Sequence, residues 1–221
     1  MRSEHGGGVP ESTAFSQTLA ALKREGSNLL VVGRTDEGGH REVCRRLLGS
    51  DADDEYFRLS VVTSGSERCG WLPRGRAGVD RIVAVDGAAD LDRRTDAELT
   101  TVDGTFLSTV ANAVFEVADE FEAAREGAEA AQFRLCLDPL GPLFASHDPE
   151  NIFRLLHMIT ARVRQLDGMG HVHLRVEHDS NHVNLLEPLF DAVVEVRAGD
   201  EEPEHRWYLR GSDTTSDWVT I

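Results

Sequence analysis

A glycine-rich segment that directly follows an apolar run is the first place in this sequence where residue types and spacing could do chemistry. Residues 29–32 read Leu-Leu-Val-Val, and Gly33 and Gly38 then occupy both glycine positions of the pattern G-x-x-x-x-G-K-[ST]. In such a loop, backbone N–H groups and a helix N-terminus bind phosphate, the lysine neutralises its charge, and the hydroxyl holds Mg²⁺. The spacing therefore predicts a nucleotide site at this turn.

The two residues that carry most of that chemistry are replaced. Gly39 stands at the lysine position and His40 at the Ser/Thr position, and residues 36–37 add two carboxylates. Losing one charge-assisted contact costs about 1.5–3 kcal/mol. Arg34 and Arg41 flank the segment and could supply part of the missing positive charge. Any ATP or ADP would therefore be held weakly, through the backbone of this segment.

A second candidate position is the acidic residue that ends an apolar segment at residues 133–137. Asp138 follows this strand-like run, as the carboxylate that polarises a water on Mg²⁺ does in nucleotide hydrolases. Two prolines follow at 139 and 142, so the same residue could instead cap the turn after the strand. Both interpretations of Asp138 remain open at this point.

Four histidines form the other grouping with metal-binding chemistry. His171 and His173 alternate along a strand-like segment, and His178 and His182 follow at helical spacing. Imidazole suits zinc and nickel. Nothing in the sequence makes the two pairs converge, so we interpret them as surface histidines and expect no metal site.

The cysteines and the basic segments suggest little further chemistry. Cys44, Cys69 and Cys136 form no C-x-x-C pair and leave an odd cysteine, which argues against a disulfide framework and against a Cys-based zinc site. Residues 65–81 carry four arginines around Trp71, as a nucleic-acid loop would. We expect no nucleic-acid partner, because the chain as a whole is strongly acidic.

The acidic, lysine-poor composition indicates a protein that works in concentrated salt. The net charge is −16, from 23 basic and 39 acidic residues, and Lys23 is the only lysine. Such a lysine-poor, acidic chain resembles proteins that work in multimolar salt, where the Debye length falls to roughly 3 Å and the self-repulsion is screened. No apolar run is long enough to cross a bilayer, so we expect a cytoplasmic protein without membrane insertion.

Helical and strand-like segments alternate along the chain. Because the strands read as continuous apolar runs, we expect an α/β fold whose mostly parallel sheet is covered on both faces. Residues 1–12 are predicted to be a disordered tail and residues 13–221 a single domain. The predicted helices are 15–23, 36–48, 101–124, 149–166 and 183–190, and the predicted strands are 29–32, 58–62, 82–85, 133–137, 172–176, 192–196 and 207–209.

The chain resembles the RecA/KaiC-like branch of the P-loop NTPases, and more closely the degenerate haloarchaeal relatives known as HTR-like proteins. The resemblance covers about residues 13–221 and implies a RecA-like three-layer α/β/α arrangement. The segments that carry it are SNLLVVG (27–33), CRRLLG (44–49), RLCLDPLGPL (134–143), ENIFRLLHMITARVRQLDG (150–168) and LFDAVVEVR (189–197).

The sequence departs from that family at the positions that hydrolyse ATP. KaiC-like ATPases carry a glutamate after the second strand, whereas here no carboxylate follows until Glu67. With the lysine and the hydroxyl also missing, we expect no catalytic residues and a pseudo-ATPase that acts in regulation or signalling through a protein partner or self-association. The alternative is a weak ATP/ADP switch that uses residues Gly33, Arg34, Gly38, Gly39, His40, Arg41 and Asp138, with Mg²⁺ as a possible cofactor.

Overall fold

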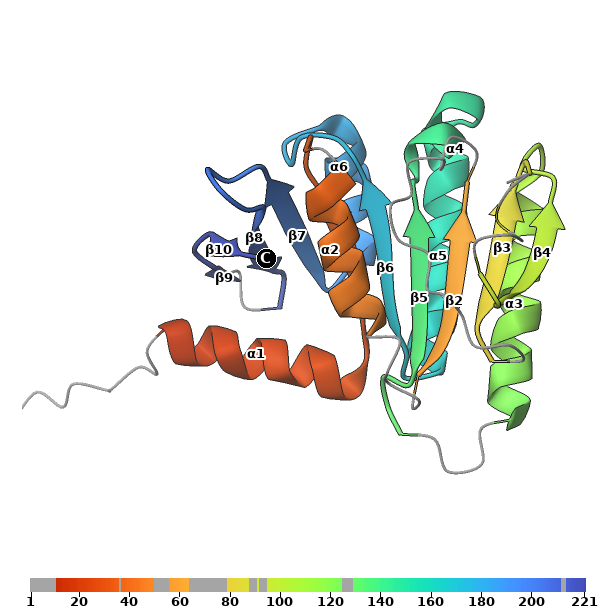
Figure 1. Ribbon diagram of the computed structural model, residues 1–221, viewed down its shortest axis with the longest axis horizontal. Coiled ribbons are helices and arrows are strands. Elements are labelled where there is room, and N and C mark those ends of the chain that lie inside the picture. Colours follow the sequence, from red (N-terminus) through yellow and green to blue (C-terminus); the bar gives the residue numbers. More distant parts are fainter. Residues whose placement is uncertain are drawn as a thin grey trace, which may run out of the picture.

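The computed structural model shows one mixed β-sheet with helices packed against it (Figure 1). Residues 1–10, within the expected tail, lie outside the described part, whereas a helix already begins at Glu11. Most of the basic segment 65–81, including Trp71, and Cys69 also lie outside it. The structure describes residues 11–35, 37–49, 56–63, 79–87, 91, 95–124, 129–211 and 214–221.

The sheet is parallel through its centre and antiparallel at one edge. Its strand order is β10-β8-β7-β1-β6-β5-β2-β3-β4, with β9 paired to β8. All pairs from β7 to β4 are parallel, whereas β8 pairs antiparallel with β7, β9 and β10. The strands are β1 (Ser27–Val32), β2 (Phe57–Val62), β3 (Arg81–Val85), β4 (Glu98–Val102), β5 (Phe133–Asp138), β6 (Met169–Leu174), β7 (Ala192–Arg197), β8 (Glu204–Leu209), β9 (Thr214–Thr215) and β10 (Val219–Thr220).

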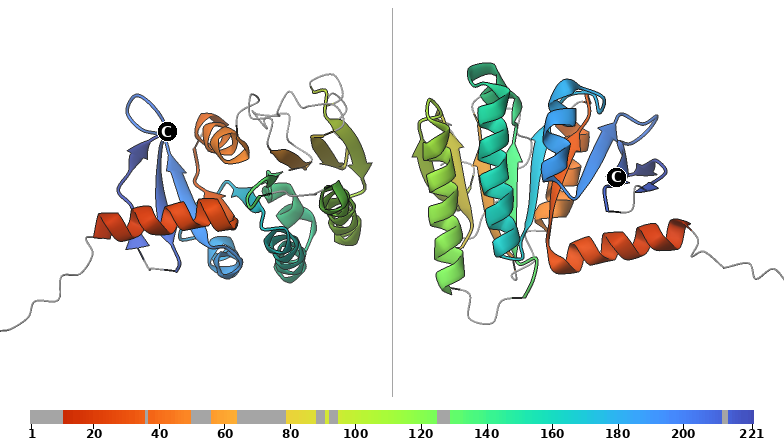
Figure 2. Two further views of the ribbon diagram at one scale, coloured as in Figure 1. Left: turned by 90° about the horizontal axis from the view of Figure 1, so that it is seen from below. Right: turned by 180° about the vertical axis from the view of Figure 1, so that it is seen from behind.

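The helices lie on both sides of this sheet. Figure 2 shows α2 on one side and α3, α5 and α6 on the other. None of the described helices combines the length and the apolar character that crossing a membrane requires. The helices are α1 (Glu11–Glu25), α2 (Glu37–Leu48), α3 (Leu107–Ala124), α4 (Gly141–Ser146), α5 (Pro149–Gln165) and α6 (Asn181–Leu186), followed by the 3₁₀ turn η2 (Glu187–Leu189).

Strand β1 shows why the apolar runs are continuous. Leu30 and Val32 point into the core shared with α3 and α5, whereas Leu29 and Val31 pack with Val43 of α2. All four β1 side chains are at most 1% exposed. A strand that is buried on both faces cannot alternate between apolar and polar residues. The predicted α/β fold with a mostly parallel sheet is confirmed.

The predicted helix over 101–124 is wrong in its first turn and a half. Residues 98–102 form the edge strand β4, and the helix begins only at Leu107. Between them, Gly104 donates its N–H to the Asp86 carboxylate (2.7 Å) and so ties this turn to the end of β3. Phe106, expected on the buried helix face, is 63% exposed. Apolar spacing that happened to continue across a turn produced the error.

The predicted strand over 172–176 is shifted along the chain. Strand β6 runs from Met169 to Leu174, and every one of its residues is buried. The predicted range begins three residues late, at Val172, although the alternation of His171 and His173 already indicated a strand at this place. Here the parallel pairing with β1 and β5 brings Gly170 and His171 into the sheet.

A buried ion pair joins α2 to the strands β2 and β3. Arg58 donates from Nε to the Leu48 carbonyl (3.0 Å) and from Nη1 to the Asp80 carboxylate (3.4 Å). The side chains of Arg58 and Asp80 are each 1% exposed. Removing one member of a buried pair leaves an uncompensated charge in the interior, which is costly.

We expect Arg58→Ala to lower the free energy of unfolding by about 3–5 kcal/mol, measured by urea denaturation at constant high KCl. As a control, Arg46→Ala removes an exposed pair with Glu42 and should change stability by about 1 kcal/mol or less. Equal losses in the two variants would contradict a buried pair at Arg58.

Candidate functional site

The predicted phosphate loop begins at the end of β1, where Gly33 lies in a tight passage. Its φ of 129° is one that glycine adopts easily and other residues rarely do. Its N–H donates to the Val176 carbonyl (2.9 Å), and a Cβ at this position would collide with the Val196 carbonyl. Gly33 therefore packs against the backbone that follows β6 and the backbone of β7, and its amide already has a partner.

Gly39, at the position of the phosphate-binding lysine, is also packed against β7. A Cβ on Gly39 would lie 2.5 Å from Val196 Cγ1, 3.3 Å from Thr35 Cγ2 and 3.4 Å from Pro203 Cβ. The glycine is buried in the first turn of α2. A side chain at this position would require the Val196 side chain of β7 to shift. The sequence thus lacks a lysine at this position, and neighbouring side chains occupy the space that a lysine would need.

His40, at the position of the metal-binding hydroxyl, turns into the protein. It is fully buried, with Nε2 at 2.9 Å from the Gly33 carbonyl and Nδ1 at 3.0 Å from Nδ1 of His173. Burial lowers the pKa of His40 below its ordinary value of 6.5, although the bond to Gly33 opposes this shift. The neutral His40 ring therefore lies beneath the loop and hydrogen-bonds to its first residue, Gly33.

The hydrogen bonds of His40 determine which ring nitrogens carry protons. The Gly33 carbonyl can only accept, so Nε2 of His40 carries the proton, and the neutral ring then has an acceptor at Nδ1. His173 must therefore donate from Nδ1. We assign the proton of neutral His173 to Nδ1, which leaves a lone pair on its Nε2.

The remaining predicted nucleotide residues do not form a cradle in the described part of the chain. Asp138 is nearly buried at the end of β5, where Arg175 donates to both of its carboxylate oxygens (3.3 and 3.4 Å). Arg34, Gly38 and Arg41 are exposed. Gly33, Gly39 and His40 lie together, but they are packed against protein.

A compact group of sulfur and nitrogen atoms lies beneath α2. Cys44 Sγ is 3.3 Å from Cys136 Sγ and 3.4 Å from His171 Nε2. These residues and His173 each offer one donor atom, and the four atoms lie within 4.8 Å of one another. His171 and His173 are fully buried, and Cys44 and Cys136 are 3% and 4% exposed. We name these four residues the Cys-His cluster.

The fold explains how the Cys-His cluster converges. Cys136 on β5 pairs in register with His171 on β6, and His173 follows two residues later on the same face. Cys44 lies one helical turn after His40 on α2, so both point to that face. Burial lowers the pKa of His171 and of His173 well below the ordinary value, which keeps both rings neutral.

The expectation of surface histidines is wrong for His171 and His173. His178 and His182 lie elsewhere: His178 stacks on Tyr208 (ring centroids 4.1 Å apart), and His182 packs against Phe144 with the two rings tilted (4.3 Å). The argument from cysteine spacing overlooked that cysteines far apart in sequence can meet across a sheet. Two patterns in the sequence were available as signals. His171 and His173 alternate along one predicted strand, with Cys136 on another, and His40 and Cys44 have helical spacing.

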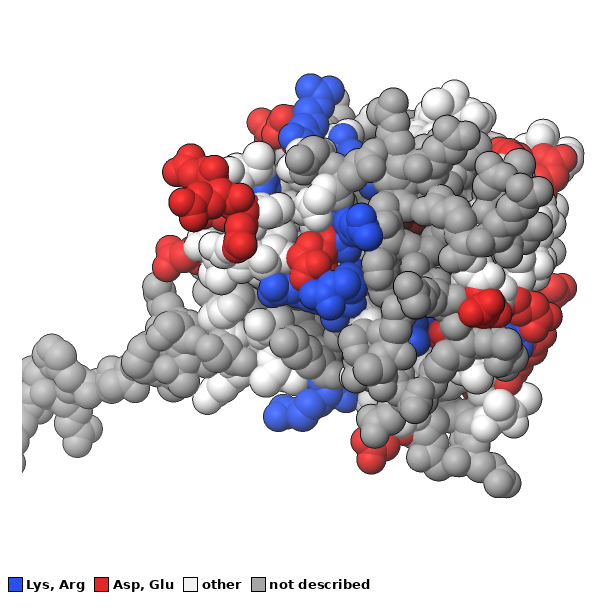
Figure 3. Space-filling view, viewed as in Figure 1, with Lys and Arg blue, Asp and Glu red and all other residues white. Residues whose placement is uncertain are grey.

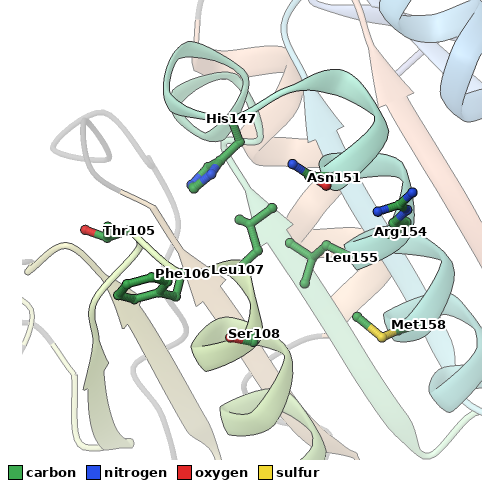
Figure 4. A pocket seen from close by; sticks show the side chains of 9 residues that line it. All are labelled: Thr105, Phe106, Leu107, Ser108, His147, Asn151, Arg154, Leu155 and Met158. Carbon is green, nitrogen blue, oxygen red and sulfur yellow. The ribbon is translucent and has the colours of Figure 1, made fainter.

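A separate hollow of about 310 Å³ lies between the beginnings of α3 and α5. Figure 4 shows Phe106 and Leu107 on one side and His147, Arg154 and Met158 on the other. Phe106 is 63% and Met158 41% exposed, so the hollow has an apolar rim. It is remote in the chain from the predicted phosphate loop.

The face that carries α2 has a mixed charge. Basic and acidic side chains lie side by side there (Figure 3). On α2 itself, Glu42 pairs with Arg45 (2.5 Å) and Arg46 (3.2 Å). The arginines at this surface are thus partly neutralised by a neighbouring carboxylate.

The packing of Gly39 can be tested by adding a single methyl group. We expect Gly39→Ala to lower the free energy of unfolding by about 1–3 kcal/mol, because the buried side chain of Val196 must shift to admit the Cβ. Gly141→Ala is the matched control, since a Cβ there meets nothing within 4 Å. An unchanged midpoint of urea denaturation for Gly39→Ala would show that the lysine position is open.

Comparison with known proteins identifies the family of the chain. No curated protein matches the sequence. A family model described as a family of unknown function, DUF7504, matches residues 26–196. This range runs from the start of β1 to β7 and includes the predicted phosphate loop and the whole Cys-His cluster. Because the match covers more than half of the chain, the protein belongs to the DUF7504 family.

Proposed function

We propose that this protein is a non-catalytic pseudo-ATPase of the RecA/KaiC-like type that acts as a regulatory or signalling protein through protein contacts or self-association. The observation that carries the proposal is the inward position of His40. Its ring bonds to Gly33 and His173 at the place where a working loop holds metal and phosphate. A buried neutral imidazole offers neither the charge nor the hard oxygen that Mg·ATP requires.

Two further features support the loss of turnover. At Gly39, the lysine position, neighbouring side chains occupy the space that a lysine would need, and Arg175 pairs with Asp138, the residue predicted to face a metal. An aspartate that is neutralised by an arginine is a poor ligand for Mg²⁺. The three-layer RecA-like arrangement belongs to the same proposal and is supported by the parallel strands and by helices on both sides of the sheet.

Calorimetric titration of Mg·ATP and Mg·ADP into the full chain at multimolar KCl tests the loss of nucleotide chemistry. We expect no binding up to millimolar nucleotide and no release of phosphate, because Gly33 and His40 use their polar atoms within the protein.

Micromolar binding that Arg34→Ala weakens would contradict this proposal and favour a weak ATP/ADP switch. Arg34 is the appropriate probe because it is exposed at the loop, whereas substitution of Gly33 would collide with Val196. Hydrolysis that Asp138→Asn abolishes would also contradict it.

Self-association is the form of contact for which the surface offers a specific place. Phe106, Met158 and Val219 are the exposed large apolar side chains of the described part, and the first two line the hollow of Figure 4. Arg154 is exposed at the same hollow. A second copy of this acidic chain can supply both an apolar side chain and a carboxylate to this place.

We expect the wild type to show a concentration-dependent increase in mass in sedimentation velocity at high KCl. Phe106→Ser should shift the association to at least tenfold higher protein concentration, a change of about 1.4 kcal/mol. Val219→Ser is the matched control on β10 and should behave like the wild type. A wild type that remains monomeric throughout would contradict self-association through this hollow.

A further inference from the structure

We propose that the Cys-His cluster is a binding site for a zinc ion, with Cys44, Cys136, His171 and His173 as its four ligands. Two thiolates and two imidazoles form a common ligand set of structural zinc sites. The four residues come from α2, β5 and β6, so the ion would join the helix to the centre of the sheet. This inference is independent of the proposed loss of nucleotide chemistry.

The first argument is that the cluster contains buried nitrogen atoms without partners. Nε2 of His173, a proposed ligand atom, is buried and makes no hydrogen bond within the described structure. Nδ1 of His171 is also buried without a hydrogen bond, but it is the nitrogen opposite the Nε2 that faces Cys44, so the ligand atom without a partner is that of His173. Buried polar atoms almost always have a partner, and an ion is one explanation when they do not. The proton assignment above gives Nε2 of His173 a lone pair, which is the form of imidazole that binds a metal.

The second argument is distance. Around a tetrahedral zinc ion with Zn–S of about 2.3 Å and Zn–N of about 2.0–2.1 Å, neighbouring ligand atoms lie about 3.3–3.8 Å apart. The observed separations are 3.3 Å between the two sulfurs and 3.4 Å between Cys44 Sγ and His171 Nε2. To admit the ion, the two sulfurs must move apart by about 0.5 Å, and any pair of donor atoms near the 4.8 Å limit of the cluster must come closer.

The third argument is charge. When zinc binds, Cys44 and Cys136 each lose one thiol proton to solvent, and two thiolates with two neutral imidazoles balance the two positive charges of the ion. The filled site is therefore neutral, which is the condition for burying it in the core. Soft thiolate ligands also favour zinc over magnesium or calcium.

The hydrogen bond from His173 to His40 has a clear role in this site. A histidine that binds zinc usually donates its other ring N–H to a neighbouring acceptor, which fixes the ring and its tautomer. Here Nδ1 of His173 donates to His40, and His40 in turn donates to the Gly33 carbonyl. His40 is thus a positioning residue, and it links the metal ligand to the altered phosphate loop.

The direct test is the metal content of the full chain, purified at high KCl without chelator and measured by inductively coupled plasma mass spectrometry. We expect stoichiometric zinc in the wild type and its loss in Cys44→Ser and His173→Gln. Cys69→Ser and His182→Gln are the matched controls and should retain zinc. A wild type without zinc that also takes up none when zinc is added would overturn the proposal, as would retention of zinc in both ligand variants.

Cobalt gives a readout of the ligand set in the wild type itself. Adding Co²⁺ to wild-type protein after zinc removal should produce thiolate-to-cobalt charge-transfer absorption and the intense visible bands of a tetrahedral ion. His40→Gln should weaken metal affinity about 10–100-fold while leaving these bands in place. A disulfide between Cys44 and Cys136 in the wild type as purified, identified by peptide mapping, would overturn the assignment.

Discussion

The structure depends on the buried contact between His40 and the sheet. A helix that follows a parallel strand can direct its first turn toward solvent and bind an anion, or it can direct it inward and pack. Here the imidazole of His40 bonds to the strand-end carbonyl of Gly33 and to His173 of β6. The inward direction of His40 brings α2 close to the sheet. This close approach is possible only because Gly39 has no side chain that would collide with Val196.

Other features of the site agree with the same constraint. One helical turn after His40, Cys44 meets Cys136 and His171. Farther along, the carbonyl of Leu48 accepts from buried Arg58, so both ends of α2 are attached to the strands. The proposed zinc ion and the proposed loss of nucleotide chemistry thus involve one helix. Because α2 faces inward, it brings ligands to the proposed zinc ion and withdraws the polar groups that nucleotide binding would need.

Patterns that repeat over many residues were predictable from the sequence. Continuous apolar strands and helices of regular period gave the α/β class and most elements, because burial on both faces leaves a clear signal. Strand β4 was missed because the period of α3 extends by chance through Val102 and Phe106, whereas the turn depends on a bond between Gly104 and Asp86 that only the folded chain contains.

The turn between strand β1 and helix α2 was located from spacing, but the inward packing of the helix that follows it could not be predicted. Whether His40 faces solvent or the core depends on what lies across the sheet, and His173 is more than a hundred residues away. The same holds for Cys44 and Cys136, which meet only because α2 packs against β5. Rules based on local spacing do not detect such meetings, and they led us to expect no metal site.

The central claim is that His40 is a neutral, inward-facing link between Gly33 and His173. Long-range ¹H–¹⁵N correlation spectra of the histidine rings measure this directly. The account predicts a proton on Nε2 of His40 and on Nδ1 of His173, with neither ring titrating near its ordinary pKa of 6.5 and neither signal moving when Mg·ATP is added. A His40 ring that titrates near 6.5, or that shifts with nucleotide, would contradict it.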